Sequence, residues 1–512
     1  MRTSTSVSFQ PLLQGVPASG QPVKSVSAVT GVPLAELPQS SVQDVARARD
    51  VAARAQRDWV KVPVRERAKI LLCYHDLLWK RQDEVLDLIQ LETGKSRWHA
   101  FQEVASNTMN MRYYGLRAGR ILNPARRYGL LPWLTHVMEV RAPIGVVGLI
   151  SPWNYPFDAG LSDAAPALVA GNAVLHKPDN QGALSVLWGR RLMEEAGLPP
   201  DLYQVVLGDG PTIGGAVIDN ADYVCFTGST KIGSHVGEQA GRRIIGCTLE
   251  LGGKNPMLIL DDADPAVAAS GAVRDCFTSA GQVCGSSERI YVHDKVYERF
   301  VDELLVRVRR MTLGVGLGYG PDMGSLISQR QLETVASHVD DAVSKGATVL
   351  TGGRHRPDIG PFYFEPTVLS GVTPDMTCFA TETFGPVVSL YRVHSIEEAI
   401  RLANTSTYGL SASVWGSRRR AQAVARRLRA GTVNINEIFG VSHGSVDSPM
   451  GGMKQSGVGR RHGIEGLLRF TEAQTIATQR VMQLEPPIDV GYDVLARAYT
   501  AACRLFKMIG RR

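Results

Sequence analysis

One cysteine of this 512-residue chain stands where its thiol could react. Cys284 lies in the run Gly281-Gln282-Val283-Cys284-Gly285, after a predicted helix, and the flanking glycines leave the thiol open to a ligand. A thiolate attacks carbonyl carbon readily, so this placement indicates a covalent nucleophile. The alternative is a small buried side chain, which is the usual state of a free cysteine. The pentapeptide by itself leaves both interpretations equally open.

A carboxylate and an amide are the next candidates. Glu250 ends an apolar strand just before two glycines, where partial burial would raise its pKa toward that of a general base. An ion-paired strand end is the alternative. Asn154 follows the first predicted strand of a sheet, in the segment 151–156 (Ser-Pro-Trp-Asn-Tyr-Pro). Its side-chain NH2 is of the kind that stabilises an oxyanion.

A third kind of chemistry is suggested by the turn at residues 226–233. Gly228 and Ser229 connect a predicted strand to a predicted helix, and the free N–H groups of such a helix start, with the Ser229 hydroxyl, suit a phosphate. The turn lacks the GxGxxG spacing of dinucleotide-binding folds, so it is a weak signal alone.

The elements that must position these residues follow the rhythm of an α/β sheet. Short apolar runs at 145–150, 173–177, 202–207, 223–227 and 243–249 alternate with amphipathic helices, and the pattern restarts at 256–260 and 289–292. Such runs are typical of parallel strands covered on both faces, which predicts two doubly wound α/β lobes. Helical periodicity at 42–55, 64–78 and 85–91 predicts that the first hundred residues form a helical layer.

Composition excludes several classes of protein. The 56 Lys and Arg against 49 Asp and Glu give a net charge of +7, too small a surplus to indicate nucleic acid. The arginine clusters, Arg460 and Arg461 included, are interpreted as solvated helix faces, apart from the terminal pair Arg511 and Arg512. Seven scattered cysteines without a CxxC pair predict reduced thiols and no metal site. Residues 1–16 lack a signal peptide and no apolar run approaches the ~20 residues of a membrane span, so a cytoplasmic location is expected.

Taken in order, these segments resemble the aldehyde dehydrogenase superfamily over roughly residues 20–480. Further family-type segments are 176–178 (His-Lys-Pro), 382–386 (Glu-Thr-Phe-Gly-Pro), 434–436 (Asn-Ile-Asn) and 449–457. Within the superfamily the chain is most similar to actinobacterial succinate-semialdehyde dehydrogenases that use NADP.

The resemblance implies an aldehyde dehydrogenase-like organisation. Residues 1–132 and 143–253 would form the cofactor-binding domain, 254–448 the catalytic domain, and 449–470 a segment returning to the cofactor domain. Residues 133–142 and 471–480 would be oligomerisation strands, so a homodimer or homotetramer is expected, and 481–512 an amphipathic C-terminal tail.

The resemblance also implies residue roles. Cys284 would be the nucleophile, Glu250 the general base, and Asn154 would share the oxyanion hole with the backbone N–H of Cys284. The implied cofactor-binding positions are Ser151, Pro152, Trp153, Lys177, Asn180, Gly228, Ser229, Gly233, Leu251, Glu382 and Phe384.

The implied reaction is NAD(P)-dependent oxidation of an aldehyde to a carboxylic acid through a thiohemiacetal and a thioester. Relatives that pass the acyl group to coenzyme A lack a base at the position of Glu250, so hydrolysis is expected here. Many NAD-preferring members carry Glu three residues after the strand-end lysine, where it repels a 2′-phosphate. Neutral Asn180 follows Lys177 at that spacing, which predicts NADP with NAD possible.

The substrate expected from the resemblance is succinate semialdehyde. The two arginines that clamp its carboxylate in well-studied enzymes are missing, because Thr278 and either Ser162 or Asp163 occupy those positions. Lys454 or another arginine would have to replace them, or else the substrate is an uncharged aliphatic or aromatic aldehyde.

Rival classes and the tail complete the expectations. A non-redox cysteine acyl-transfer or esterase enzyme would need a histidine partner, the nearest being His293, and a non-catalytic scaffold would not need Cys284, Glu250 and Asn154 intact.

The tail places an apolar stripe on one helix face, which favours docking on its own body or a partner subunit over an anionic membrane surface. That stripe is Tyr492, Leu495, Tyr499, Ala502, Phe506 and Ile509.

Overall fold

The computed structural model describes residues 9–129, 135–314, 316–479 and 491–508. The chain forms two compact units. The larger comprises Met1–Ile121 and Pro143–Thr471, and the smaller comprises Leu122–Ala142 and Glu472–Arg512. The larger unit carries two extended sheets and all the predicted site residues.

The first sheet has the strand order β19-β9-β8-β5-β6-β7. Its strands are β5 (Val146–Ser151), β6 (Ala173–Pro178), β7 (Tyr203–Val205), β8 (Tyr223–Thr227), β9 (Gly246–Glu250) and β19 (Gly457–Val458). The pairs within β5 to β9 are parallel, and only β19 runs antiparallel to its neighbour, with Gly457 opposite Glu250. All six side chains of β6 are buried, which explains the continuous apolar run.

Helices connect and cover these strands. They are α2 (Val42–Trp59), α3 (Val64–Lys80), α4 (Gln82–Thr93), α5 (Arg97–Ile121), α6 (Pro156–Ala170), α7 (Ala183–Glu195), α8 (Gly215–Asp219) and α9 (Thr230–Arg242). The start of α2 is a capping box between Ser41 and Asp44, and α4 ends at Gly94 in the left-handed region with φ 72°. The predicted strand at 243–249 starts only at Gly246, because α9 continues to Arg242.

The expected helical layer over the first hundred residues is wrong for residues 20–39. After the short α1 (Gln10–Leu13), β1 (Gly20–Val26) and β2 (Pro33–Gln39) form an antiparallel hairpin. Pro22, Pro33 and Pro38 disfavour a helix there, and Gly31 supplies a turn with φ 75°. The layer begins at α2.

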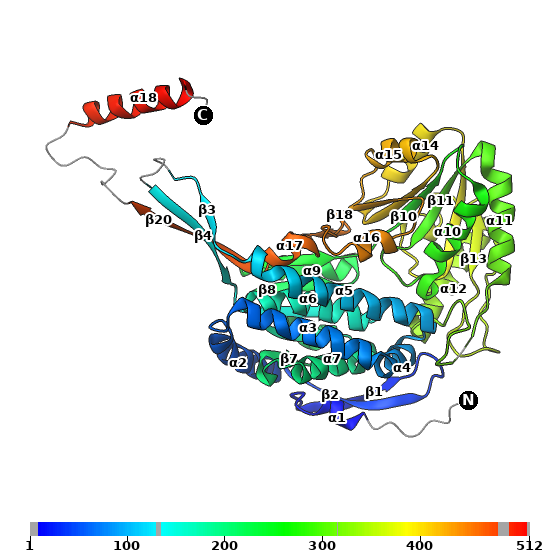
Figure 1. Ribbon diagram of the computed structural model, residues 1–512. Helices are drawn as coiled ribbons and strands as arrows, with labels where there is room; N and C mark the ends of the chain where they lie inside the picture. Colours follow the sequence, from blue (N-terminus) through cyan, green and yellow to red (C-terminus); the bar gives the residue numbers. More distant parts are fainter. Residues whose placement is uncertain (1–8, 130–134, 315, 480–490, 509–512) are drawn as a thin grey trace. The chain divides into compact units, whose positions relative to one another are not determined.

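The second sheet has the order β12-β13-β14-β11-β10-β16-β17 and is parallel except for the edge pair β12-β13. The strands are β10 (Asn255–Ile259), β11 (Ser287–His293), β12 (Thr348–Thr351), β13 (Thr367–Ser370), β14 (Val387–Val393), β16 (Ser411–Trp415) and β17 (Thr432–Ile435). Its helices are α10 (Pro265–Phe277), α11 (Tyr297–Arg310), α12 (Gln329–Ser344), α13 (Thr377–Ala380), α14 (Ile396–Asn404), α15 (Arg418–Ala425) and α16 (Gly440–Gly444). Helix α17 (Gly463–Leu468) packs instead on α5 and α6 of the first lobe. Figure 1 shows α10 and α11 beside β10, β11 and β13.

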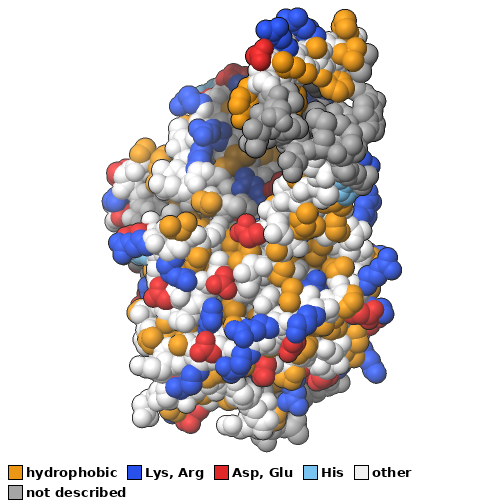
Figure 2. Space-filling view, turned by 90° about the vertical axis from the view of Figure 1, so that its left-hand side faces the viewer, with side chains coloured by type: hydrophobic (Ala, Val, Ile, Leu, Met, Phe, Trp, Pro, Cys, Tyr) orange, Lys and Arg blue, Asp and Glu red, His pale blue; other side chains and the backbone are white. Residues whose placement is uncertain are grey.

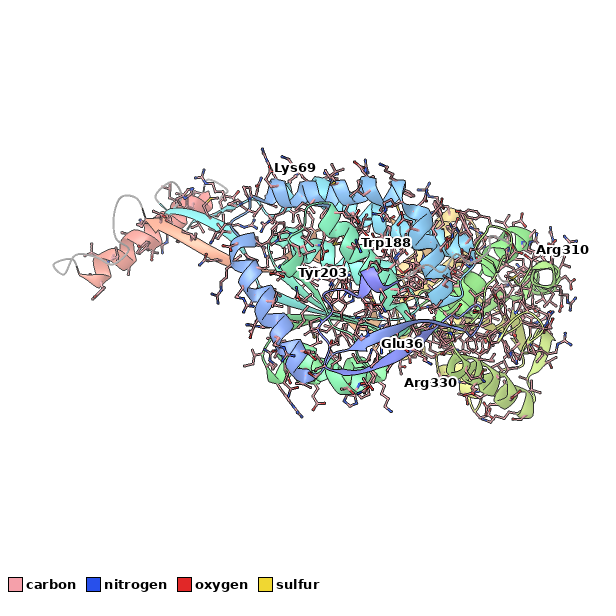
Figure 3. All side chains as sticks on the ribbon, turned by 90° about the horizontal axis from the view of Figure 1, so that it is seen from below. Glu36, Lys69, Trp188, Tyr203, Arg310 and Arg330 are labelled. Atoms are coloured by element: carbon pink, nitrogen blue, oxygen red, sulfur yellow. The ribbon has the colours of Figure 1, made fainter. Side chains whose placement is uncertain are left out.

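The two sheets confirm the predicted α/β class. A short antiparallel pair, β15 (Tyr408–Gly409) with β18 (Met453–Lys454), completes the strands of the larger unit. Trp188 and Tyr203 lie within the packed layers, whereas Lys69 and Arg310 lie at the outside (Figure 3). The assignment of cofactor-binding and catalytic domains to these sheets stays a prediction.

The smaller unit contains a three-stranded sheet of order β20-β4-β3 and a helix. The strands are β3 (Ala125–Arg127), β4 (Thr135–Pro143) and β20 (Thr471–Gln479), and the helix is α18 (Tyr492–Met508). The predicted strands and tail helix are thereby confirmed as secondary structure. Residues 133, 134, 480 and 481–490, and the tail residues Ile509, Arg511 and Arg512, lie outside the described residues.

The distribution of surface charge and the state of the cysteines agree with the expectations from composition. On the face drawn in Figure 2, Lys and Arg side chains are interspersed with Asp and Glu and do not gather into one basic patch. The seven cysteines are free thiols. Across the described ranges, no helix combines the length and apolar character required to cross a membrane.

Candidate active site

A cavity of about 610 Å³ in the larger unit brings the three predicted catalytic residues together. Asn154 reaches it from the turn after β5, Glu250 from the end of β9, and Cys284 from the loop between α10 and β11. Parallel strands end at the same edge of a sheet, so Asn154 and Glu250, which lie at the ends of β5 and β9, meet there. The loop before β11 of the second sheet brings Cys284 to them. Among the predicted cofactor positions, Pro152, Trp153, Gly228, Ser229, Leu251, Glu382 and Phe384 line the same cavity.

The loop before Cys284 has an unusual backbone. After α10, Ser279 and Ala280 adopt left-handed conformations with φ 51° and 55°, and Gly281 follows with φ 71°. A Cβ on Gly281 would lie 2.0 Å from the backbone oxygen of Gly385, so only glycine fits where this loop meets the segment after Glu382. Backbone of this kind persists only where its surroundings enforce it.

Asn154 is tied directly to that loop. Its Nδ2 donates to the backbone oxygen of Gln282 at 2.9 Å. Helix α6 begins at Pro156, directly after this turn, so Asn154 lies in a tight strand-to-helix connection and has little freedom to move. The amide and the thiol are therefore held on neighbouring walls of one cavity.

Burial dominates the electrostatics of the site. It raises the pKa of Glu250 to about 7, an effect that the cation of Arg461 opposes, and Oε1 of Glu250 has no hydrogen-bond partner among the described residues. Burial, with the charges of Glu250 and Glu382, raises the pKa of the Cys284 thiol to about 12. The thiol is thus protonated near neutral pH and needs a base, and Glu250 lines the same cavity with a pKa suited to that task.

Arg461 is a functional candidate that the sequence did not reveal. It lines the cavity, only 7% of its surface is exposed, and its Nε lies 2.9 Å from Oδ1 of Asp163. The prediction of a solvated arginine face is wrong for this residue, because its backbone pairs with Met450 and its side chain turns inward to a buried carboxylate. Either Ser162 or Asp163 occupies the position at which one of the substrate-clamping arginines was expected.

His443 was also missed. It lies in α16 and lines the cavity together with Asp158. Its Nε2 is 2.9 Å from Oγ of Ser106 and 3.3 Å from Oδ2 of Asp158. No local pattern could have revealed it, because its partners lie 337 and 285 residues away.

His293, the histidine considered as a partner of the thiol, ends β11 and is not among the residues that line the cavity. Its Nδ1 accepts from the backbone N–H of Lys295. Lys454, considered as a substitute clamp, donates from Nζ to the backbone oxygens of Asn404 and Ser406, each at 2.8 Å, and does not line the cavity either.

Aromatic and carboxylate groups form another part of the cavity wall. The rings of Trp153 and Phe384 meet edge to face, with centroids 5.4 Å apart. Glu382 accepts the backbone N–H of Gly253 at 2.7 Å, and burial raises its pKa to about 8. Ser229 caps α9 by accepting the N–H of Ile232 at 3.4 Å.

The other predicted cofactor positions, Ser151, Lys177, Asn180 and Gly233, are not among the residues that line the cavity. Ser151 bonds His176 at 2.7 Å, Nζ of Lys177 donates to the oxygen of Pro178 at 3.2 Å, and a Cβ on Gly233 would lie 2.3 Å from Leu251. Asn180 donates from Nδ2 to Gln39 at 3.1 Å, while its buried Oδ1 has no hydrogen-bond partner among the described residues. Asp179 and Gln181, on either side of Asn180, do line the cavity.

The fold and the site together define a class of protein. It is an α/β protein in which a thiol, a carboxylate and an amide line one cavity, beside a helix N-terminus of the kind that binds phosphate. The sequence model of the aldehyde dehydrogenase family matches residues 16–476, and the chain belongs to that family.

Relatives in sequence and structure agree. A protein of Mycolicibacterium smegmatis provisionally named succinate-semialdehyde dehydrogenase [NADP(+)] is 49% identical over 96% of this chain and 95% of its own length. Phenylacetaldehyde dehydrogenase of Pseudomonas fluorescens is 36% identical over 87% of this chain and 90% of its own. The crystal structure of betaine aldehyde dehydrogenase from Staphylococcus aureus in complex with NAD+ superposes with a TM-score of 0.87 at 30% identity, covering 94% of this chain and 98% of that one.

Proposed function

We propose that this protein oxidises succinate semialdehyde to succinate with NADP+, by a hydrolytic route and without coenzyme A. The observation that carries the reaction class is the meeting of Cys284, Glu250 and Asn154 in one cavity. The substrate and the preference for NADP+ are supported by the relative that is 49% identical along nearly the whole chain.

The residues of the cavity suit a nicotinamide dinucleotide. Gly228 and Ser229 offer a helix start to phosphate, and Glu382 and Phe384 would hold the nicotinamide end. Asn180 does not line the cavity itself, but it lies between Asp179 and Gln181, which do, and its buried, orphaned Oδ1 would accept a ribose hydroxyl brought to that edge. When bound, the oxidised nicotinamide supplies a hydride acceptor. Neutral Asn180 leaves room for a 2′-phosphate, which a carboxylate there would repel.

The chain's own residues account for the remaining steps. Glu250 takes the thiol proton and Cys284 attacks the aldehyde carbon, so that the carbonyl oxygen becomes an oxyanion held by the amide of Asn154 and a backbone N–H. Departure of the hydride leaves a thioester on Cys284. Glu250 releases the thiol proton to solvent and then takes a proton from water, which attacks the thioester carbon. The C–S bond breaks, the carboxylic acid leaves, and Glu250 returns its proton to the sulfur of Cys284.

The distal carboxylate of succinate semialdehyde would have to be bound by residues other than the two arginines of the well-studied enzymes. Arg461 and His443 line the cavity: Arg461 offers a cation in place of the missing arginines, and the His443 ring offers a hydrogen-bonding nitrogen. Other residues of the cavity favour an uncharged aldehyde, because the carboxylate of Asp158 would repel an anionic substrate and the side chains of Phe439 and Met450 are apolar. Phenylacetaldehyde dehydrogenase is among the relatives. An aliphatic or aromatic aldehyde is therefore the second candidate.

Comparison of kcat/KM for succinate semialdehyde, hexanal, benzaldehyde and phenylacetaldehyde, followed at 340 nm, tests the substrate. The proposal requires succinate semialdehyde to exceed the others by about tenfold or more, as one charge-assisted hydrogen bond to its carboxylate would provide inside the cavity. A higher value for an apolar aldehyde selects the second candidate. Coenzyme A dependence of the signal would overturn the hydrolytic route.

Assembly is proposed on the same footing. Strands β4 and β20 have the alternating composition that pairs subunits in the family, so we expect a homodimer or homotetramer. Helix α18 presents Leu495, Ala502 and Phe506 on one face, which favours docking on protein over an anionic membrane.

A further inference from the structure

Two buried lysine–glutamate pairs stand behind the walls of the cavity. Lys95 pairs with Glu103, and Lys254 pairs with Glu288. The four side chains are between 0% and 5% exposed, and none of the four residues lines the cavity. In each pair the carboxylate also binds backbone N–H groups of a segment that does line it.

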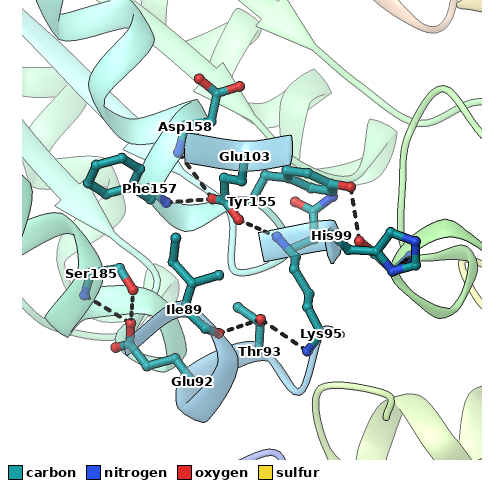
Figure 4. A network of polar contacts seen from close by, with 12 residues as sticks. Ile89, Glu92, Thr93, Lys95, His99, Glu103, Tyr155, Phe157, Asp158 and Ser185 are labelled. Carbon is teal, nitrogen blue, oxygen red and sulfur yellow. Dashed lines mark hydrogen bonds and ion pairs between the residues drawn. The ribbon is translucent and has the colours of Figure 1, made fainter. Parts of the chain in front are cut away.

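The first pair holds the turn of Asn154. Oε1 of Glu103 accepts the backbone N–H groups of Phe157 at 2.8 Å and Asp158 at 3.1 Å, as Figure 4 shows, while its Oε2 binds Lys95. These N–H groups begin α6 and have no partner within the helix. Glu103 therefore fixes the direction in which the chain leaves the turn that contains Asn154.

Lys95 extends the same contact to the loop of Cys284. Its ammonium lies 3.5 Å from the centroid of the Tyr155 ring, and the Tyr155 hydroxyl is 2.9 Å from Oγ of Ser279. Ser279 is one of the two left-handed residues before Cys284, and its backbone N–H donates to Nδ1 of His99 at 3.1 Å. The strained loop is thus anchored to the same buried group as the Asn154 turn.

The second pair holds a different wall. Glu288, in β11, accepts the backbone N–H of Thr383 at 2.9 Å and that of Phe384 at 2.9 Å. Phe384 is itself left-handed, with φ 52°. Lys254 follows the strand end of Glu250 and closes the pair. This contact fixes the segment of Glu382 and Phe384, which faces the proposed nicotinamide end.

Stability alone is a poor reason for such pairs. The free energy lost when two charges are removed from water offsets much of the free energy gained from their attraction. Proteins with apolar side chains of similar size in place of such a pair are often at least as stable. A buried carboxylate that fixes two backbone N–H groups does provide a rigid wall, and catalysis depends on such preorganisation.

We propose that the two pairs are positioning devices with separate duties: Lys95 and Glu103 set the amide and thiol that meet the aldehyde, and Lys254 and Glu288 set the segment that meets the nicotinamide cofactor. This inference rests on the proposed function, because it assigns the two walls to aldehyde and cofactor.

The test compares two double variants of the full-length protein, Lys95→Met/Glu103→Gln and Lys254→Met/Glu288→Gln. Each removes a pair without leaving an unpaired charge, and each serves as the matched control of the other. Two readouts need no turnover: the rate at which iodoacetamide alkylates Cys284, resolved from the exposed Cys73 and Cys503 by peptide mass spectrometry, and the Kd of NADPH, measured by fluorescence.

The first double variant should slow alkylation of Cys284 about fivefold or more, lower kcat about tenfold, and leave the Kd of NADPH within about twofold. The second should weaken NADPH binding about tenfold and leave alkylation within about twofold. A merely structural role would move both readouts together in both variants, or neither, and either result overturns the proposal.

If a double variant does not fold by circular dichroism, Glu103→Gln and Glu288→Gln alone are measured in the same way and judged by the same outcomes. Failure of the proposed function is separable, because it shows in the wild-type protein. A wild type that binds NADPH and is alkylated at Cys284 but oxidises no aldehyde refutes the function, whatever the variants do.

Discussion

Arg461 and Asp163 form an ion pair inside the protein, with Nε and Oδ1 2.9 Å apart and the two residues only 7% and 5% exposed. Arg469 binds the same carboxylate oxygen at 2.5 Å. Two cations thus share one anion, and the positive surplus lies beside the cavity that contains Glu250. The pair therefore acts on the base as well as on the fold.

Removal of Arg461 should move the pH dependence of the reaction. The cation lowers the pKa of Glu250, so Arg461→Met should raise it and shift the acidic limb of kcat upward by roughly one pH unit. Arg460→Met is the matched control, because Arg460 is a weaker influence on the same carboxyl, and its limb should move less. Equal shifts in the two variants would contradict a special role for Arg461.

The wild-type profile itself follows from Glu250. A general base works in its ionised form, so with a pKa of about 7 the rate should rise between pH 6 and pH 8 and then level off. Glu250→Gln should flatten that limb and lower kcat by a factor on the order of 10² to 10⁴. A limb that persists in Glu250→Gln would assign the base to another group.

Loss of the thiol should stop the chemistry and spare the cofactor. Cys284→Ala is expected to lower aldehyde oxidation by a factor on the order of 10⁴ or more, because no covalent intermediate can form. The Kd of NADPH should remain near the wild-type value. Cys276→Ala is the control: this thiol is buried in the core and does not line the cavity, so the variant should keep its activity.

Cofactor preference should respond to one side chain. Asn180→Glu places a carboxylate where Oδ1 is now orphaned, and its charge would repel a 2′-phosphate. The ratio of kcat/KM for NADP+ over NAD+ should fall by about tenfold to a hundredfold. Asn180→Gln, which adds length without charge, should leave the ratio nearly unchanged, and an equal effect of both variants would attribute the change to size.

The tail can be tested by truncation. A chain that ends at Gln479 lacks α18, and if the helix docks on protein, co-sedimentation with anionic vesicles should be equally low for both chains. Binding that is present in the full chain and lost in the truncated one would assign α18 to a membrane surface. Light scattering of the same two samples reports the oligomeric state.

Local sequence determined the parts of this protein that follow short-range rules. Apolar runs predicted the buried parallel strands because such strands are covered on both faces. Ser41 and Gly94 end helices through caps that are made within a few residues, so such ends belong to the local sequence. The segments of Glu250 and Asn154 were predicted by residue type and by their place after strands, and that of Cys284 by its flanking glycines after a helix. The β1–β2 hairpin was not predicted, although its prolines and the left-handed Gly31 oppose a helix there.

Only the tertiary structure decided which side chains meet. Arg461 looked like a surface residue until the fold placed it on Asp163, 298 positions away, and His443 gained its role from Ser106 across 337 positions. No sequence pattern indicated the roles of Lys95 and Glu103, because the backbone N–H groups that Glu103 accepts lie more than fifty residues further along the chain. Contacts of this range are set by the packing of whole elements, and no periodicity or motif within one segment encodes them.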